Sequence, residues 1–206
     1  MADSKALFLT HGALMFLAFG VFFPLAIIAV KALRGSTRRF VAVHIALNVL
    51  GWILATIAII IAYAKFDAMD TMHARIGTTV IILVWLQPFA ALLRPKVGTP
   101  IRPFWFVLHW LFGTGIIVLG WANIFFGIDI YRDTGFAGKA RNIYILYGVW
   151  IGILGLIILF LDKLPQLPGM ARGDNDVKPG VNGHPTIPKV GGPTKEYHTE
   201  APANVV

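Results

Sequence analysis

Histidines are the residues of this sequence whose type and placement could do chemistry. Four of the six histidines lie inside long apolar stretches, one to a stretch: His11, His44, His73 and His109. Imidazole groups bind metal ions and exchange protons near neutral pH. Because an ionisable group is costly inside a bilayer, four of them in apolar stretches suggest metal centres held within a membrane. His184 and His198 lie in a polar C-terminal segment, and we interpret them as solvated.

The composition is that of a membrane protein. The chain is 57% hydrophobic and only 14% charged, and its mean hydropathy is +0.72. Several of its apolar windows are about twenty residues long, which is enough to cross a bilayer as a helix. The absence of cysteine excludes disulfides, thiolate metal sites, iron–sulfur clusters and cysteine-attached haem. Metal ligands must therefore be histidine, carboxylate, methionine or backbone groups.

Five apolar stretches predict an all-α membrane protein, a bundle of five transmembrane helices. They cover residues 7–33, 40–64, 72–93, 104–127 and 143–161. Pro24 interrupts the first stretch, and neighbouring helices can tolerate it as a kink. A longer mixed-charge loop is expected over 128–142. The domain organisation expected is a short extracytoplasmic N-terminus (1–6), a membrane domain (7–162) and a disordered tail (163–206), because the tail is rich in Pro, Gly, Asn, Lys and Thr.

The formal net charge of +8 is interpreted as a topology signal. No basic segment is interleaved with aromatic residues in a soluble context, so nucleic-acid binding is not expected. One set of helix ends carries Lys31, Arg34, Arg38, Arg39, Arg94, Lys96, Arg102 and Lys163. The other carries Lys5, Lys65, Arg132, Lys139 and Arg141. The positive-inside rule then predicts an extracytoplasmic N-terminus and a cytoplasmic tail.

The position of each histidine along its helix sorts the four into two pairs. His11 and His73 stand at the outer ends of the first and third stretches, which run in the same direction. His44 and His109 each lie six residues inside the basic end of the second and fourth stretches, roughly 9 Å deep. Parity therefore predicts an outer pair and an inner pair, roughly 20 Å apart along the bundle.

Two imidazoles that face each other at one depth can hold a haem iron from both axial sides. Such ligation leaves no open position and suits electron transfer. Gly77 follows His73 by four residues and Gly113 follows His109 likewise, which would leave space for a porphyrin on the same helix faces. Asn48 offers a hydrogen bond four residues after His44. Singly, each histidine is equally compatible with an interhelical hydrogen bond; pairing by depth favours ligation.

These residues resemble the membrane domain of the cytochrome b561 family, above all the type that follows an extracellular DOMON domain in fungal and plant proteins. The resemblance covers about residues 7–162. Its motifs are His11-Gly12 with Pro24, His44 with Asn48 and Gly51, His73-x-x-x-Gly77 with Gln87-Pro88 and Arg94-Pro95, and His109-x-x-x-Gly113 with Leu119-Gly120-x-x-Asn123.

The resemblance implies a four-helix core with two haem b per chain, held by the four histidines. It also implies one-electron transfer from a cytoplasmic donor, commonly ascorbate, to monodehydroascorbate, a ferric chelate or a partner redox domain such as a DOMON-type haem domain. The chain would then be a transmembrane ascorbate-dependent oxidoreductase, similar to a ferric reductase, in the plasma membrane or a secretory-pathway membrane. The family usually has six helices. The helix that is missing here would precede the first, in a longer chain or a short stand-alone member.

Other residues have weaker assignments. Lys31, Arg34 and Arg38 form a cationic rim that would attract an anionic reductant, or are ordinary positive-inside charges. Arg75 would pair with a haem propionate or extend to the lipid headgroups. On the fifth helix, 148–152 begins and ends with glycine, a spacing typical of close packing or of a homodimer contact.

Two alternative functions remain at this point. One is a quinol-linked subunit with two b haems, whose electrons come from the membrane. The other is a haem-free membrane scaffold, which would be colourless. A transporter is not favoured, because no broken helix pair with carboxylates lies near the midplane. A proton pump is not favoured either, because no buried Asp or Glu is available as a relay.

Overall fold

The computed structural model describes residues 2–33, 39–66, 70–134 and 140–163. All regular secondary structure in these ranges is helical. The elements are α1 (Ala2–Met15), the π-helix η1 (Phe16–Phe22), α2 (Phe23–Ala32), α3 (Arg39–Lys65), α4 (Met72–Leu92), α5 (Arg102–Asp133) and α6 (Ala140–Lys163). The first three form one continuous helix, so the described residues contain five helices that are long and apolar enough to span a membrane, which confirms the predicted number.

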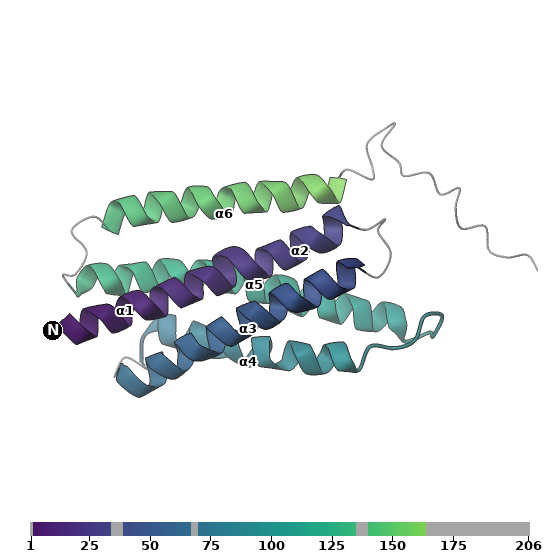
Figure 1. The fold of residues 1–206 in the computed structure, drawn as a ribbon, viewed down its shortest axis with the longest axis horizontal. Coiled ribbons are helices and arrows are strands. Elements are labelled where there is room, and N and C mark those ends of the chain that lie inside the picture. Colours follow the sequence, from purple (N-terminus) through teal and green to yellow (C-terminus); the bar gives the residue numbers. More distant parts are fainter. Residues whose placement is uncertain (1, 34–38, 67–69, 135–139, 164–206) are drawn as a thin grey trace, which may run out of the picture. The chain divides into compact units, whose positions relative to one another are not determined.

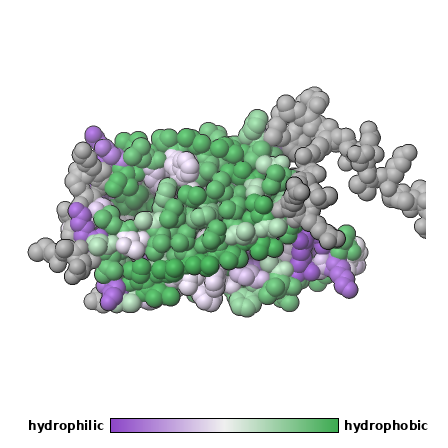
Figure 2. All heavy atoms as spheres, viewed as in Figure 1, coloured by the Kyte–Doolittle hydropathy of each residue, from purple (hydrophilic) through white to green (hydrophobic). Residues whose placement is uncertain are grey.

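The helices belong to one compact unit, Met1–Met170, and a second unit covers Ala171–Val206. The tail predicted over 163–206 lies outside the described residues except for Lys163, which ends α6. Large apolar side chains are exposed along the middle of the first unit, and hydrophilic ones gather towards its two ends (Figure 2). This distribution fits a helical bundle whose middle section faces the hydrocarbon of a lipid bilayer.

A four-helix core forms from the first helix, α3, α4 and α5. α1, η1 and α2 pack along α3, α4 packs on α5, and α6 lies against α2 and α5 (Figure 1). Buried apolar side chains fill the middle of this core: Ala18, Phe19, Phe23, Ala55, Val80, Ile81, Val84, Ile116 and Ile117. The core cluster separates the two ends of the bundle with an apolar layer.

Pro24 is fully buried and is the second residue of α2, two positions after the end of the π-helix η1. Proline has no backbone N–H, so carbonyls one turn earlier lose their usual donor. Two indole groups replace it. Trp121 donates to the Phe19 carbonyl at 2.8 Å, and Trp150 donates to the Gly20 carbonyl at 2.7 Å. The irregular turn of the first helix is thus satisfied from α5 and α6.

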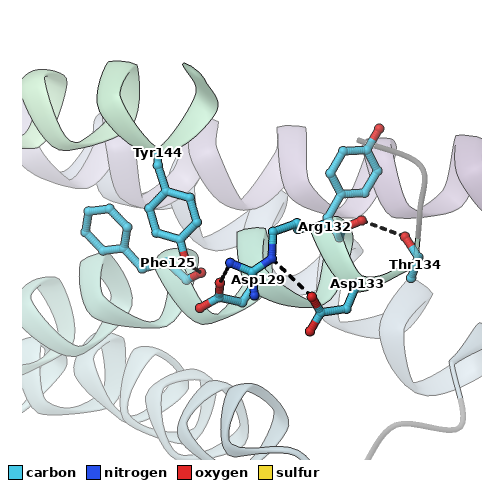
Figure 3. A network of polar contacts seen from close by, with 7 residues as sticks. Phe125, Asp129, Arg132, Asp133, Thr134 and Tyr144 are labelled. Atoms are coloured by element: carbon cyan, nitrogen blue, oxygen red, sulfur yellow. Dashed lines mark hydrogen bonds and ion pairs between the residues drawn. The ribbon is translucent and has the colours of Figure 1, made fainter. Parts of the chain in front are cut away.

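α5 is longer than the sequence predicted, and the loop expected to begin at residue 128 was wrong in its first part. The helix continues through Asp133. Nothing in this stretch breaks a helix, and Arg132 bridges Asp129 at 3.0 Å and Asp133 at 3.1 Å on the outside of its last turn (Figure 3). Tyr144 of α6 donates to the Phe125 carbonyl at 3.2 Å, which fastens the start of α6 to this extension.

Candidate functional site

His11 of α1 and His73 of α4 face each other near one end of the bundle. Their ring centroids are 6.0 Å apart and their planes are inclined by 80°. Both rings are partly buried. Phe66 contacts the edge of His11 with a centroid distance of 6.0 Å, and Phe8 stacks on Phe66 at 4.4 Å. This aromatic pair borders the first histidine pair at the end of α3.

His44, near the start of α3, and His109, near the start of α5, form a second pair towards the other end of the bundle. Their centroids are 6.5 Å apart with an interplanar angle of 65°. The structure therefore brings together the same partners that helix parity predicted. Among the described residues no cluster of three or more His, Cys, Asp or Glu side chains could hold a bare metal ion. Each site consists of two imidazoles only.

Hydrogen bonds across the bundle fix three of the four rings. Nδ1 of His11 donates to the Ala58 carbonyl at 2.9 Å. Nδ1 of His44 donates to the Ala26 carbonyl at 3.0 Å, and Nδ1 of His73 donates to the Asn123 carbonyl at 3.0 Å. A carbonyl only accepts, so each Nδ1 carries the proton and Nε2 keeps its lone pair. The three rings are thus prepared to bind a metal through Nε2.

These bonds also show which residues of α3 and α5 lie at the level of the other histidine pair, and so give the separation of the two sites. Ala58 follows His44 by fourteen residues on α3, and Asn123 follows His109 by fourteen residues on α5. At 1.5 Å per residue the two levels are about 21 Å apart on both helices. The separation agrees with the value expected from the sequence, and the buried apolar cluster lies between the levels.

His109 is held differently from the other three. Its Nδ1 is buried and has no hydrogen-bond partner among the described residues. Trp105, one turn earlier on α5, lies parallel to its ring at a centroid distance of 5.2 Å and an angle of 9°. The amide of Gln87 donates to the backbone carbonyl of His109 at 3.4 Å. Aromatic stacking on Trp105 takes the place of the carbonyl contact at this histidine.

Glycines make room for side chains in ways that the sequence only partly indicated. A Cβ on Gly77 would meet the Asn123 amide at 3.0 Å, so this glycine admits a side chain of α5. A Cβ on Gly113 would be no closer than 3.9 Å to Gln87. Gly127 was missed: its Cβ would lie 3.0 Å from Cε1 of His73. The sequence did contain a signal for Gly127, because a glycine inside a helix lowers its stability and is usually kept for close packing.

Two other predicted haem-contact residues point to local partners or to the outside. The Asn48 amide donates to the carbonyl of His44 at 2.7 Å, within its own helix. Arg75 is exposed, and positions two residues apart on a helix do not share a face. Arg75 therefore projects away from the side of α4 that carries His73, and its pairing with a propionate stays a prediction.

The predicted donor rim is only partly described. Lys31 forms an ion pair with Asp162, with only 11% of the lysine side chain exposed, and so joins α2 to α6. Arg34 and Arg38 lie outside the described residues. The role of these three residues in donor binding stays a prediction.

A family model described as eukaryotic cytochrome b561 matches residues 10–132, which include all four histidines. The chain belongs to the eukaryotic cytochrome b561 family. This family membership, together with the apolar helices, makes it a multi-pass membrane protein of a haem b family that transfers electrons.

Curated relatives carry the same family name. A cytochrome b561 domain-containing protein of Arabidopsis thaliana is 29% identical over 78% of this chain and 65% of its own length. A cytochrome b561 and DOMON domain-containing protein of the same plant is 28% identical over 86% of this chain and 46% of its own. A Drosophila melanogaster protein named "Putative ferric-chelate reductase 1 homolog" is 32% identical over 62% of this chain and 21% of its own length. The chain thus spans about two thirds or less of the length of these relatives.

The residues of both pairs fit the haem that this b561 family binds. A transition metal binds an imidazole nitrogen at about 2 Å, so two rings on opposite sides of one metal have centroids roughly 6 Å apart. Both observed separations match this value. A porphyrin supplies the remaining four nitrogens, which explains why two histidines suffice.

Buried polar atoms without partners support the same conclusion. In the described part of the chain, apart from His109 Nδ1, they are Trp52 Nε1, Thr56 Oγ1, Gln87 Oε1 and Asn123 Oδ1. Buried polar atoms normally have partners, so several orphans in the core of one small bundle indicate that a bound group completes it. Trp52 and Thr56 lie one turn apart on α3, on the same face.

Proposed function

We propose that this chain carries single electrons across a membrane through two b haems, from a cytoplasmic reductant such as ascorbate to an acceptor on the other side. The observation that carries the proposal is the presence of two facing histidine pairs, with centroid separations of 6.0 and 6.5 Å, at two levels of one bundle. Haem bound at these pairs would supply the one-electron chemistry, because its iron can be ferric or ferrous.

The chain's own residues do the rest. His11 with His73 and His44 with His109 would bind the two groups through Nε2. The carbonyls of Ala58, Ala26 and Asn123 orient three of these rings and raise their basicity. The buried apolar cluster keeps water out of the space between the levels, so that charge cannot leak as protons or ions along the same route.

Orientation follows from charge. The helix ends near the His44–His109 pair carry more basic residues than those near the His11–His73 pair, so we propose that the former face the cytoplasm. A cationic rim there would also concentrate an anionic reductant. The names of the relatives support a ferric chelate or a DOMON-type domain as acceptor. The other face would then deliver electrons to it.

The test is an optical and haem-quantitation study of the purified full chain, with His73→Leu, His109→Leu and His184→Ala as matched variants. We expect two haems per chain in the parent protein and in His184→Ala, and one in each of the other two. Ascorbate in detergent, with quinol absent, should reduce the haem. Colourless folded protein would overturn the proposal in favour of a scaffold, and reduction only by a quinol would replace the donor.

A further inference from the structure

The four histidines are not equivalent, and the difference lies in how each ring is kept from rotating. Three rings are anchored by Nδ1 to a carbonyl of a neighbouring helix. His109 has no such anchor in the described part of the chain, although its Nδ1 is buried. A ligand imidazole with no partner on its second nitrogen is free to rotate about the Cβ–Cγ bond, and this freedom weakens metal binding. Some other contact must orient this ring.

Trp105 provides that contact. It precedes His109 by one helical turn on α5, and the two rings are nearly parallel, with an angle of 9° and a centroid distance of 5.2 Å. A flat indole against one face of the imidazole blocks rotation of the His109 ring about its Cβ–Cγ bond. Trp105 is itself fixed, because its Nε1 donates to the Ala90 carbonyl of α4 at 2.8 Å. The stack is therefore tied to a second helix.

The guanidinium of Arg94, which follows the end of α4, lies over the indole of Trp105. The central carbon of its guanidinium lies 5.9 Å from the Trp105 ring centroid, within the range of a cation–π contact. A cation in this position disfavours a further positive charge nearby. It would therefore favour the ferrous state of a haem held by His109 over the more positive ferric state.

We propose that Trp105 is the positioning residue for His109 and that Arg94 acts through the same stack to raise the potential of the haem at the His44–His109 pair. The inference rests on the proposed function, because it presupposes haem at this pair. It assigns two roles within one stack: the indole holds the ligand ring, and the guanidinium makes the bound group easier to reduce.

The orienting role is tested with three variants in the full chain. Trp105→Leu removes the stack and the bond to Ala90, Trp105→Phe keeps an aromatic face, and Trp110→Leu is the matched control. Trp110 follows His109 directly but is 57% exposed. The readouts are the low-spin ferric electron paramagnetic resonance signal and the rate of haem transfer to apomyoglobin. His44→Leu identifies the signal that belongs to this pair.

Trp105→Leu should broaden the signal of the His44–His109 haem and release that haem at least fivefold faster. Trp105→Phe should restore most of the parent behaviour, and Trp110→Leu should match the parent. An unchanged signal and release rate in Trp105→Leu would overturn the inference. So would an equal disturbance of the His11–His73 haem, because that would indicate a general loss of packing.

The electrostatic role is tested by a potentiometric titration of Arg94→Gln against Lys96→Gln, which removes an exposed cation from the same connection. At a fixed ambient potential, Arg94→Gln should lower the ferrous-to-ferric ratio of the His44–His109 haem roughly threefold to tenfold, where tenfold is about 59 mV. Lys96→Gln should change it less. Equal effects would refute a specific role for Arg94. If the parent protein holds no haem, the proposed function fails before any variant is compared.

Discussion

Replacing Gly127 with alanine should weaken haem binding at the His11–His73 pair without destabilising the helix that carries the change. The added Cβ would lie 3.0 Å from Cε1 and 3.4 Å from Nδ1 of His73. Carbon atoms attract best at about 3.5–4.0 Å, so the ring would have to retreat by roughly 0.5 Å. That movement also strains the 3.0 Å bond from Nδ1 to the Asn123 carbonyl.

The magnitude follows from the cost of overpacking. Extra methyl groups in a well-packed site typically cost about 1–3 kcal/mol. Because 1.4 kcal/mol is a factor of ten in affinity, haem at this pair should be held roughly 5- to 150-fold less tightly. The helix itself gains up to about 1 kcal/mol when alanine replaces glycine in its interior. Weaker haem binding with an unchanged or higher melting temperature of the haem-free chain is therefore the expected signature.

The assay is haem transfer from purified protein to apomyoglobin, with the two haems distinguished by their resonance signals and by His73→Leu. Gly115→Ala is the matched control: it lies on the same helix, gains the same propensity, and its Cβ would have nothing within 4 Å. Equal retention of both haems in Gly127→Ala and Gly115→Ala would refute the argument. Loss of both haems together would show that Gly127 supports the bundle and not one ligand.

Three further sets of substitutions test other contacts. Trp121→Phe and Trp150→Phe each leave a carbonyl of η1 without its indole donor, and each should cost about 0.6–1.7 kcal/mol in thermal unfolding, with Trp110→Phe neutral. Phe66→Ala removes the aromatic contact beside His11 and admits water. Because water favours the charged ferric state, the midpoint potential of a haem at the His11–His73 pair should fall in a potentiometric titration. Phe89→Ala is the control and should not change this potential, because the Phe89 side chain is already 59% exposed. Asp162→Asn should lower the unfolding temperature, because it removes the carboxylate that pairs with the Lys31 ammonium, whose side chain is only 11% exposed, and adding Lys31→Met should recover part of the loss. A raised KM for ascorbate in Lys31→Met at normal stability would indicate donor binding.

The sequence was sufficient for the spans and for the pairing of histidines because both depend on position along a helix. Apolar length fixes where a chain crosses a bilayer, and parity then places His11 with His73 and His44 with His109. It was not sufficient for the π-helix before Pro24. A proline indicates a missing donor, but the replacement donors come from Trp121 and Trp150, more than one hundred residues later.

The anchoring of the histidine rings could not be predicted from the sequence for a related reason. The acceptors for His11, His44 and His73 are backbone carbonyls, which every residue has, so no residue type marks them. What the sequence does contain is the space that such contacts need. Ala26 and Ala58 are small, and Gly127 follows Asn123 by one turn, so an imidazole can approach the backbone at all three places.

His109 lacks this arrangement, and its sequence surroundings differ accordingly. The residue one turn before it is a tryptophan, and the carbonyl of His109 receives the Gln87 amide while its own Nδ1 receives nothing. A backbone anchor raises the basicity of a ligand and so favours ferric iron, whereas a stacked indole orients the ring without that effect. Two sites with the same ligand type can therefore differ in potential through packing alone. A haem at the His44–His109 pair, with one anchored and one stacked histidine, should therefore be easier to reduce than a haem at the His11–His73 pair.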